Sequence, residues 1–192
     1  DYVAHKKPQP AYVYASSSSV YGLNKKIPFS ELHAIDHPAN LYGTSKFGNE
    51  QIAAAYHNIH GLKSVGLRFF TVYGPWGRPD MAVSLFTNKI ENGETITLFN
   101  GGEMWRDFTF VDDIVQGIEL SMEYCSDNAA VFNLGNSKPV KLGYFLEQIE
   151  KRLGVKAKFK YQASNAEIKE TYADVSKAHE LLGYQPTTSI ES

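Results

Sequence analysis

The stretch Ser16-Ser17-Ser18-Ser19-Val20-Tyr21-Gly22, read together with Tyr42-Gly43-Thr44-Ser45-Lys46, decides the fold. The first segment follows a run of alternating aromatic and small residues at 11–15 that is typical of a buried strand, so its hydroxyls are expected at the rim of a sheet. The second segment opens a predicted helix at 42–58, and its i, i+4 spacing puts the Tyr42 phenol and the Lys46 ammonium on one helix face.

These residue types suit proton transfer at an alcohol. A free phenol titrates near pH 10, so it serves as a base at neutral pH only beside a positive charge such as that of Lys46. The Ser17 hydroxyl can hold a substrate oxygen about 2.6–3.2 Å from the Tyr42 oxygen, the reach that general base catalysis needs. Taken separately, a serine run is typical of a turn and a Tyr/Lys pair is typical of a solvated helix face. Their joint occurrence in this order favours a catalytic site.

The rest of the chain alternates strand and helix patterns. Strands are expected at 64–70, 95–99, 106–111, 131–134 and 157–161, and helices at 82–92, 112–124, 142–153 and 174–183. A strand, a helix and a strand in succession predict a βαβ unit and a parallel sheet. Asp112 and Asp113 are expected to cap the helix at 112–124. The buried face of the helix at 42–58 is expected to contain Ile52 and Ile59.

Composition bounds the class of protein. The 192 residues are 43% hydrophobic and 21% charged with a net charge of −2, which is typical of a globular chain with one substantial core. The basic residues are dispersed and balanced by acids, so no nucleic-acid partner is expected. The single cysteine, Cys125, excludes an internal disulfide and fits a reducing compartment. With no apolar run near the roughly 18 residues of a membrane span, no signal peptide and no expected metal site, we predict a cytoplasmic protein without membrane contact.

The strand-end serines with Tyr-x-x-x-Lys resemble the extended short-chain dehydrogenase/reductase family. Within it, the stretch Gly66-Leu67-Arg68-Phe69-Phe70-Thr71-Val72-Tyr73-Gly74-Pro75-Trp76-Gly77-Arg78-Pro79-Asp80-Met81 resembles the nucleotide-sugar 4-epimerases, most closely those of UDP-glucuronate. The resemblance runs through almost the whole chain and implies an α/β fold. Residues 1–74 would be the remaining part of an NAD-binding, Rossmann-like, doubly wound parallel sheet. Residues 75–192 would form a smaller α+β substrate-binding domain, with 106–135 partly returning to the sheet.

The resemblance also implies NAD as cofactor, a UDP-sugar as substrate, and roles for individual residues. Ser17 would hold the sugar 4-OH, Tyr42 would be the base, and Lys46 would be the cation that also binds the nicotinamide ribose. Tyr42 and Phe70 would lie at the nicotinamide. Substrate contacts are implied for Ser18, Ser19, Thr71, Arg78, Leu98, Phe99, Arg106 and Glu167.

Several of these substrate contacts have structural alternatives. A guanidinium fork suits a diphosphate, but Arg106 followed by Asp107 is also a pattern of an ordinary ion pair. Thr71 could instead cap a strand end, and Leu98 with Phe99 could simply fill a strand core. Glu167 stands where the family commonly has aspartate.

The strand-end residues also separate related reactions. Sugar-nucleotide 4,6-dehydratases have Thr-Asp-Glu at the position of Ser17, Ser18 and Ser19, and UDP-glucuronate decarboxylases have a glutamate there, whereas this chain has only hydroxyls. The expected reaction is therefore NAD-dependent epimerisation at C4, from UDP-glucuronate to UDP-galacturonate through a 4-keto sugar. The alternatives are a 4-epimerase of a neutral UDP-hexose and a non-catalytic nucleotide-sugar-binding module.

A glycine-rich phosphate-binding turn, G-x-G-x-x-G or G-x-x-G-x-x-G, is missing from the sequence. By resemblance, the chain is expected to start at about the fourth strand of the dinucleotide-binding sheet. We therefore expect these 192 residues alone to be inactive. The full-length protein is expected to be a homodimer, with the helix at 42–58 in its four-helix interface.

Overall fold

A computed structural model of the chain describes residues 1–124, 128–163 and 169–191. Its helices are α1 (Tyr2–His5), α2 (Leu41–His60), α3 (Ala82–Glu91), α4 (Val111–Glu123), α5 (Leu142–Leu153) and α6 (Ser176–Leu182), with 3-10 turns η1 (Ser18–Tyr21) and η2 (Asn100–Gly102). Its strands are β1 (Tyr12–Ser17), β2 (Ser64–Phe69), β3 (Thr71–Tyr73), β4 (Thr95–Phe99), β5 (Trp105–Arg106), β6 (Phe108–Phe110), β7 (Ala129–Leu134), β8 (Val140–Lys141), β9 (Lys158–Gln162) and β10 (Glu170–Thr171).

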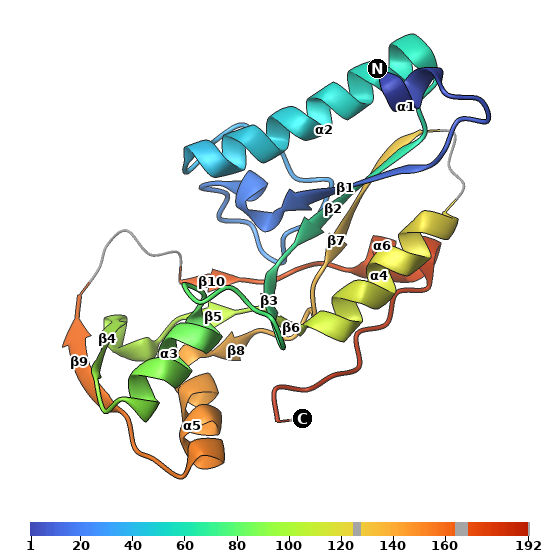
Figure 1. Cartoon of the computed structure of the whole chain (residues 1–192). Helices are drawn as coiled ribbons and strands as arrows, with labels where there is room; N and C mark the ends of the chain where they lie inside the picture. The colour runs from blue at the N-terminus through green and yellow to red at the C-terminus, as the bar shows by residue number, and fades with distance from the viewer. Residues whose placement is uncertain (125–127, 164–168, 192) are drawn as a thin grey trace.

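The main sheet has three parallel strands in the order β1-β2-β7. Strand β1, helix α2 and strand β2 follow one another, so the predicted βαβ unit and parallel pairing are confirmed. Strand β7 reaches the same sheet from much later in the chain. Helix α2 lies on one side of the sheet, whereas α4 and α6 lie together on the other side of the view in Figure 1. The α/β fold class is as predicted.

The two faces of this sheet differ chemically. On the α4 side, an apolar cluster is formed by Val65, Leu67, Ile114, Phe132, Leu134, Ala178, Leu182 and Tyr184. On the α2 side, the buried side chains are polar, namely Ser16, Glu50, Arg68 and Asn133. The predicted buried face of α2 is therefore wrong: Ile52 and Ile59 are 58% and 72% exposed, while α2 buries Gly43, Glu50 and Ala53.

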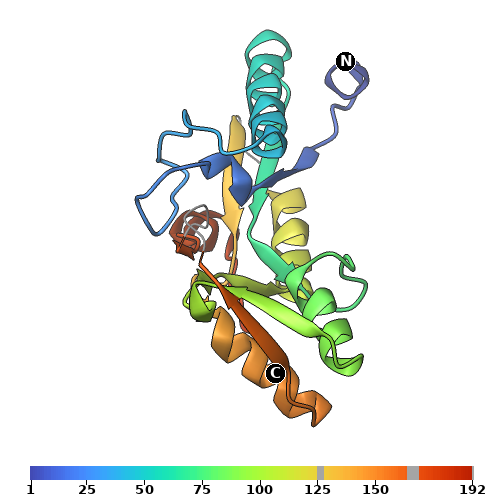
Figure 2. The ribbon, with the colours of Figure 1, turned by 90° about the vertical axis from the view of Figure 1, so that its left-hand side faces the viewer.

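Beyond β3, the chain builds three smaller sheets. Strands β3 and β6 pair in parallel, as do β4 and β9, and β5 lies between β10 and β8. Figure 2 shows β9 beside β4, with α3 and α5 in the same lower part of the molecule. This part has a core of its own, formed by Ile90, Ile96, Leu98, Met104, Phe108, Leu142, Phe145 and Leu146.

The strand predicted at 106–111 is instead two short strands separated by Asp107. The Asp107 N–H donates to the Thr171 carbonyl at 3.1 Å, and its own carbonyl accepts from the Thr71 N–H at 3.1 Å. The backbone therefore changes partner at this residue, from the β10 side to the β3 side. Apolar periodicity does not report such a change, because both short strands keep the same pattern.

Capping residues explain one predicted helix and correct another. Helix α2 begins where the Asn40 side chain accepts the Gly43 N–H at 2.8 Å, and it ends at Gly61, which has the left-handed conformation with φ of 64°. The predicted cap of α4 is wrong, since its N-cap is Phe110 and makes no side-chain bond. The Asp113 carboxylate instead accepts the backbone N–H groups of Thr187 and Thr188 at 3.0 and 3.1 Å.

Two searches over the described residues gave negative results. None of the helices in the described part has both the length and the apolarity that a membrane span requires. Within the same residues, His, Cys, Asp and Glu side chains do not gather in threes as a metal site would need.

Candidate active site

The first turn of α2 lies directly against the serine-bearing turn η1. A Cβ atom added to Gly43 would lie 2.4 Å from the Ser19 carbonyl oxygen, so only glycine permits this approach. Tyr42 precedes Gly43, and Ser18 and Ser19 are the first residues of η1. The structure therefore brings the two segments that the sequence singled out into contact.

Ser17 ends β1 and starts η1. Its side-chain oxygen accepts the Ser19 N–H at 3.1 Å, and the residue is 8% exposed. A hydroxyl that accepts one bond still has its own hydrogen to donate. Ser17 can therefore donate to an oxygen bound in front of the strand end while its position is fixed by the turn.

The loop at residues 23–40 holds η1 from its other side. Gly22 has φ of 55°, and a Cβ added to it would lie 1.9 Å from the His37 carbonyl oxygen. That same oxygen accepts the Leu23 N–H at 2.9 Å. The long loop expected from the sequence is thus packed against the turn that carries the candidate serines.

Lys46 connects α2 to the end of β1. Its ammonium donates to the Ala15 carbonyl at 3.0 Å and lies 5.7 Å from the centre of the Tyr42 ring. Tyr42 itself is 54% exposed, so its phenol is accessible to a ligand. A lysine ammonium has three hydrogens, and the bond to Ala15 uses one of them. Lys46 can therefore place positive charge beside Tyr42 and still donate to a hydroxylated ligand.

Phe70 and Thr71 follow the adjacent strand β2. Phe70 is 8% exposed and packs with Tyr21 and Phe29, at ring-centre distances of 6.3 and 6.4 Å. Thr71 is half-buried at the start of β3. Phe70 thus belongs to an aromatic cluster that packs against η1, and its contact with a nicotinamide stays a prediction.

Arg78 lies in the loop after β3 and forms an exposed ion pair with Asp80. The two side chains meet through Nε–Oδ1 and Nη2–Oδ2 contacts of 3.0 and 2.5 Å. The hydrogen bond and the charge of Asp80 raise the pKa of Arg78, and the Tyr42 phenol acts in the same direction. Arg78 is therefore within electrostatic range of Tyr42.

The remaining predicted contacts lie in the smaller sheets. Leu98 is 4% exposed in the core and Phe99 is half-buried beside it, as the strand-core alternative expects. Arg106 donates to the Trp105 carbonyl at 2.9 Å and lies 3.7 Å from the Met104 sulfur. The Asp107 carboxylate accepts backbone N–H groups rather than forming the alternative ion pair with Arg106. Glu167 lies outside the described residues.

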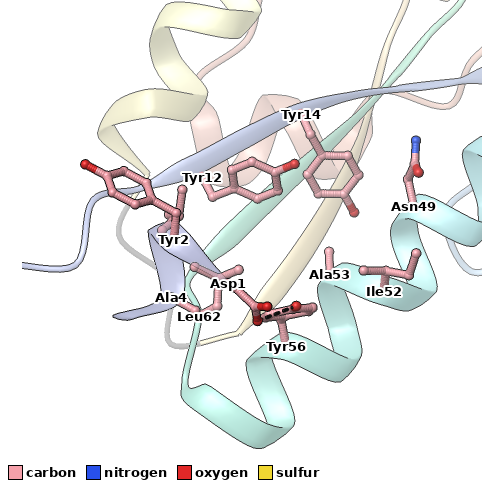
Figure 3. A pocket seen from close by; sticks show the side chains of 11 residues that line it. Asp1, Tyr2, Ala4, Tyr12, Tyr14, Asn49, Ile52, Ala53, Tyr56 and Leu62 are labelled. Carbon is pink, nitrogen blue, oxygen red and sulfur yellow. Dashed lines mark hydrogen bonds between the residues drawn. The ribbon is translucent and has the colours of Figure 1, made fainter. Parts of the chain in front are cut away.

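A separate cavity of about 460 Å³ lies toward the other end of α2. It is enclosed by α1, β1 and α2, and Figure 3 shows Tyr12 and Tyr14 facing it together with Asn49, Ile52 and Tyr56. The Tyr56 hydroxyl donates to the Asp1 carboxylate at 2.7 Å at its edge (Figure 3). Its described lining includes none of the predicted site residues, so this cavity is distinct from the candidate active site.

Comparison with known proteins decides the family. Residues 2–135 match the NAD dependent epimerase/dehydratase family. The chain belongs to this family. The observed fold agrees with the extended short-chain dehydrogenase/reductase resemblance that the serines and Tyr-x-x-x-Lys had indicated.

Individual relatives are also similar over most of the chain. An uncharacterised protein of Methanocaldococcus jannaschii is 53% identical over 93% of the chain and 55% of its own length. UDP-glucuronate 4-epimerase 1 of Arabidopsis thaliana is 46% identical over 96% of the chain and 47% of its own length. A UDP-glucuronic acid 4-epimerase from Bacillus cereus, solved with UDP-glucuronic acid and NAD, superposes with a TM-score of 0.85 at 33% identity over 94% of this chain and 58% of that one. The chain thus spans about half the length of the curated relatives it matches.

The donors at the end of β1 fit one end of an NAD molecule. The Lys46 ammonium keeps hydrogens for ribose hydroxyls, and the half-exposed Tyr42 phenol is beside it. Because the glycine-rich turn is missing from the sequence, these family members' pyrophosphate contacts have no counterpart among the motifs of this chain. The residues present therefore suit the nicotinamide-ribose end.

Sequence reasoning missed the residues that assemble the site. Gly43 was quoted as part of a motif without a role, although a glycine at the first turn of a helix that already begins with an Asn cap is a signal of close packing. Tyr21 was also overlooked. Its hydroxyl is buried between Arg68 and Asn133, and burial raises the pKa of Tyr21 to about 12 even though Arg68 opposes this shift.

Proposed function

We propose that the protein carrying this chain is an NAD-dependent 4-epimerase of a UDP-sugar, and that its substrate is UDP-glucuronate, which it interconverts with UDP-galacturonate. The observation that carries the proposal is the contact of Gly43 with Ser19, which puts Tyr42 and Lys46 next to the strand-end serines. Identity of 46% to a UDP-glucuronate 4-epimerase supports the choice of sugar.

The proposed mechanism assigns a step to each of three side chains. The Ser17 hydroxyl donates to the sugar O4 and holds it in place, and the Tyr42 phenolate takes the proton of that hydroxyl. The Lys46 charge favours the phenolate and its free hydrogens orient the nicotinamide ribose. When bound, NAD would accept hydride from C4 and return it to the opposite face of the 4-keto sugar. Tyr42 then returns the proton.

The absence of acidic residues at the strand end supports epimerisation over related reactions. Elimination of water from the sugar needs a further acid and base, and positions 17–19 supply only hydroxyls. Thr71, at the end of the neighbouring strand, is proposed to donate to the glucuronate carboxylate. Ser18, Ser19, Arg78, Leu98, Phe99, Arg106 and Glu167 are proposed as further substrate contacts, and Phe70 as a cofactor contact.

We also propose a division of the chain that accompanies this function. Residues 1–74 would belong to the NAD-binding domain and residues 75–192 mainly to the substrate-binding domain. A homodimer of the full-length protein and a cytoplasmic location are proposed on the resemblance alone.

The test is an assay of the full-length protein with NAD and UDP-glucuronate, with products separated by chromatography. UDP-galacturonate is the expected product, and exclusive formation of UDP-xylose would overturn the proposal. Conversion of UDP-glucose or UDP-N-acetylglucosamine in preference to UDP-glucuronate would support the alternative of a neutral-sugar epimerase. If the full-length protein binds UDP-sugars but converts none of them, the binding-module alternative holds.

A further inference from the structure

A buried ion pair lies between α2 and the main sheet. The Glu50 carboxylate and the Arg68 guanidinium meet through two hydrogen bonds, Nε–Oε1 at 2.9 Å and Nη2–Oε2 at 2.7 Å. Their side chains are only 4% and 5% exposed. This bidentate geometry fixes the orientation of both planar groups, and therefore the distance and rotation of α2 relative to β2.

The same ion pair holds both ends of the serine segment. At one end, the Ser16 hydroxyl donates to Glu50 Oε1 at 2.5 Å. At the other end, Arg68 Nη1 donates to the Tyr21 hydroxyl at 3.0 Å. Ser17, Ser18 and Ser19 lie between these two anchors. The segment that bears the candidate substrate-binding hydroxyls is thus attached at each end to one partner of the pair.

Tyr21 extends the network to the third strand. Its hydroxyl donates to Asn133 Oδ1 at 2.7 Å, and Asn133 Nδ2 donates to the carbonyls of Phe29 and Asp174 at 2.8 and 3.0 Å. Each polar group of this network therefore has a defined partner. A fully satisfied buried network of this kind restricts the core to one arrangement.

Glu50 also stands in register with the candidate base. It follows Lys46 by four residues and Tyr42 by eight, so the three lie in successive turns along one stripe of α2. Any rotation or shift of α2 at Glu50 is transmitted to Tyr42 and Lys46 through the rigid helix. The ion pair is consequently connected to both halves of the candidate active site.

A buried ion pair is weak evidence for stability, because the cost of removing two charges from water offsets much of their attraction. An apolar pair of similar volume would serve the packing of α2 equally well. The need for exact relative geometry between two catalytic segments gives a reason for charged groups at these positions. We propose that Glu50 and Arg68 are positioning residues, which set the placement of Ser17 relative to Tyr42 and Lys46 for proton transfer at the sugar hydroxyl. This inference rests on the proposed function.

The first experiment uses two buried serines of neighbouring strands as a matched pair in the full-length protein. Ser16 and Ser64 are both 2% exposed, but Ser16 Oγ is bonded to Glu50, whereas Ser64 Oγ lacks a partner in the described part of the chain. Ser16→Ala is expected to lower kcat at least ten-fold with KM changed less than two-fold. Ser64→Ala should leave both constants within two-fold of wild type, and equal kcat values for the two variants would overturn the inference.

The second experiment separates positioning from stability. Glu50→Gln and Arg68→Met each leave one buried partner unpaired and should lower Tm, whereas the double variant Glu50→Leu/Arg68→Met should recover most of that Tm. If the pair positions the site, kcat of the double variant stays at least ten-fold below wild type. If the pair is only structural, kcat recovers together with Tm. Arg68→Lys, which keeps the charge but not the fork, should fold with a kcat between the two.

A third readout does not depend on turnover. Hydrogen–deuterium exchange of peptides covering residues 16–22 and 41–47 should be faster in the folded double variant than in wild type. Unchanged exchange in both peptides would overturn the inference. If wild-type protein converts no UDP-sugar, the proposed function fails first, and the exchange data still decide whether the ion pair holds the two segments together.

Discussion

Gly43 faces the carbonyl oxygen of Ser19 so closely that an added Cβ would lie only 2.4 Å from that oxygen. Because the atom it would meet is backbone, no side-chain rotation can relieve the contact. The relation between α2 and η1 therefore depends on the absence of a side chain at this residue. It also explains why the residue after the candidate base is glycine.

Gly43→Ala should consequently impair catalysis more than stability. The new methyl group must push the first turn of α2 away from η1, which separates Tyr42 from Ser17, and we expect kcat to fall at least ten-fold. Gly48→Ala in the same helix is the matched control, since a Cβ there meets no atom within 4 Å. Alanine at that position should stabilise the protein by up to about 1 kcal/mol with kcat unchanged. Steady-state kinetics and urea unfolding of both variants measure this, and equal kcat values would contradict the predicted contact.

Lys46→Met should remove the charge beside Tyr42 and the bond to the Ala15 carbonyl while keeping the length of the side chain. Loss of an assisted general base lowers rates by about 10²–10⁴, and we expect kcat to fall within that range. Lys151→Met, at an exposed position in the last turn of α5, is the control and should leave kcat unchanged. Binding of UDP, measured by calorimetry, should be similar in both variants. A Lys46→Met enzyme with wild-type kcat would exclude the proposed role of this ammonium.

The local part of the fold could be predicted from the sequence. Strand β1, helix α2 and strand β2 follow from apolar runs and helix-ending glycine, and their bounds differ from the prediction by only a few residues at each end. The proximity of Tyr42, Lys46 and the serines was also predictable, because each lies where a strand ends or a helix begins. These features depend on short-range sequence patterns.

The rest depended on contacts between distant residues. The apolar positions Ile52 and Ile59 suggested the wrong buried face of α2, because the sheet beneath this helix presents Ser16 and Arg68 rather than an apolar surface. Periodicity describes how apolar residues are spaced, but it does not tell which surface they meet. Glu50 has a charge that indicates solvent exposure unless Arg68, eighteen residues away, is known to lie opposite.

Arg78→Met should weaken binding of UDP-sugar, because an exposed guanidinium within electrostatic range of Tyr42 is suited to an anionic group of the substrate. We expect Kd to rise about ten-fold and the difference from wild type to shrink as salt concentration increases. Asp80→Asn is the informative partner variant, since it frees the guanidinium from its present ion pair. Kd for the Asp80→Asn protein should be equal to or lower than that of wild type. If Arg78→Met binds as tightly as wild type at low salt, Arg78 is not a substrate contact.

Glu150→Gln should destabilise the protein in a pH-dependent way. Glu150 is buried at the end of α5, and its carboxylate accepts from the Lys156 ammonium and from the Ala157 N–H, both at 2.7 Å. Burial alone would raise the pKa of Glu150, but these two bonds prevail and the net pKa lies below the ordinary value. A carboxyl group with a lowered pKa in the folded state stabilises that state above its unfolded pKa, and this contribution is lost as pH falls through the folded pKa.

We therefore expect Glu150→Gln to reduce the free energy of unfolding by about 1 kcal/mol at pH 7, a modest value because the Lys156 partner is solvent-exposed. The difference from wild type should decrease steadily below pH 4.5, where the native carboxylate begins to be protonated. Urea unfolding at pH 7, 5 and 3.5 measures it, with Glu147→Gln as a control on an exposed position of the same helix. The control should differ little from wild type at any of these pH values. A Glu150→Gln effect that is constant over this range would show that packing, rather than the charge of the carboxylate, connects α5 to β9.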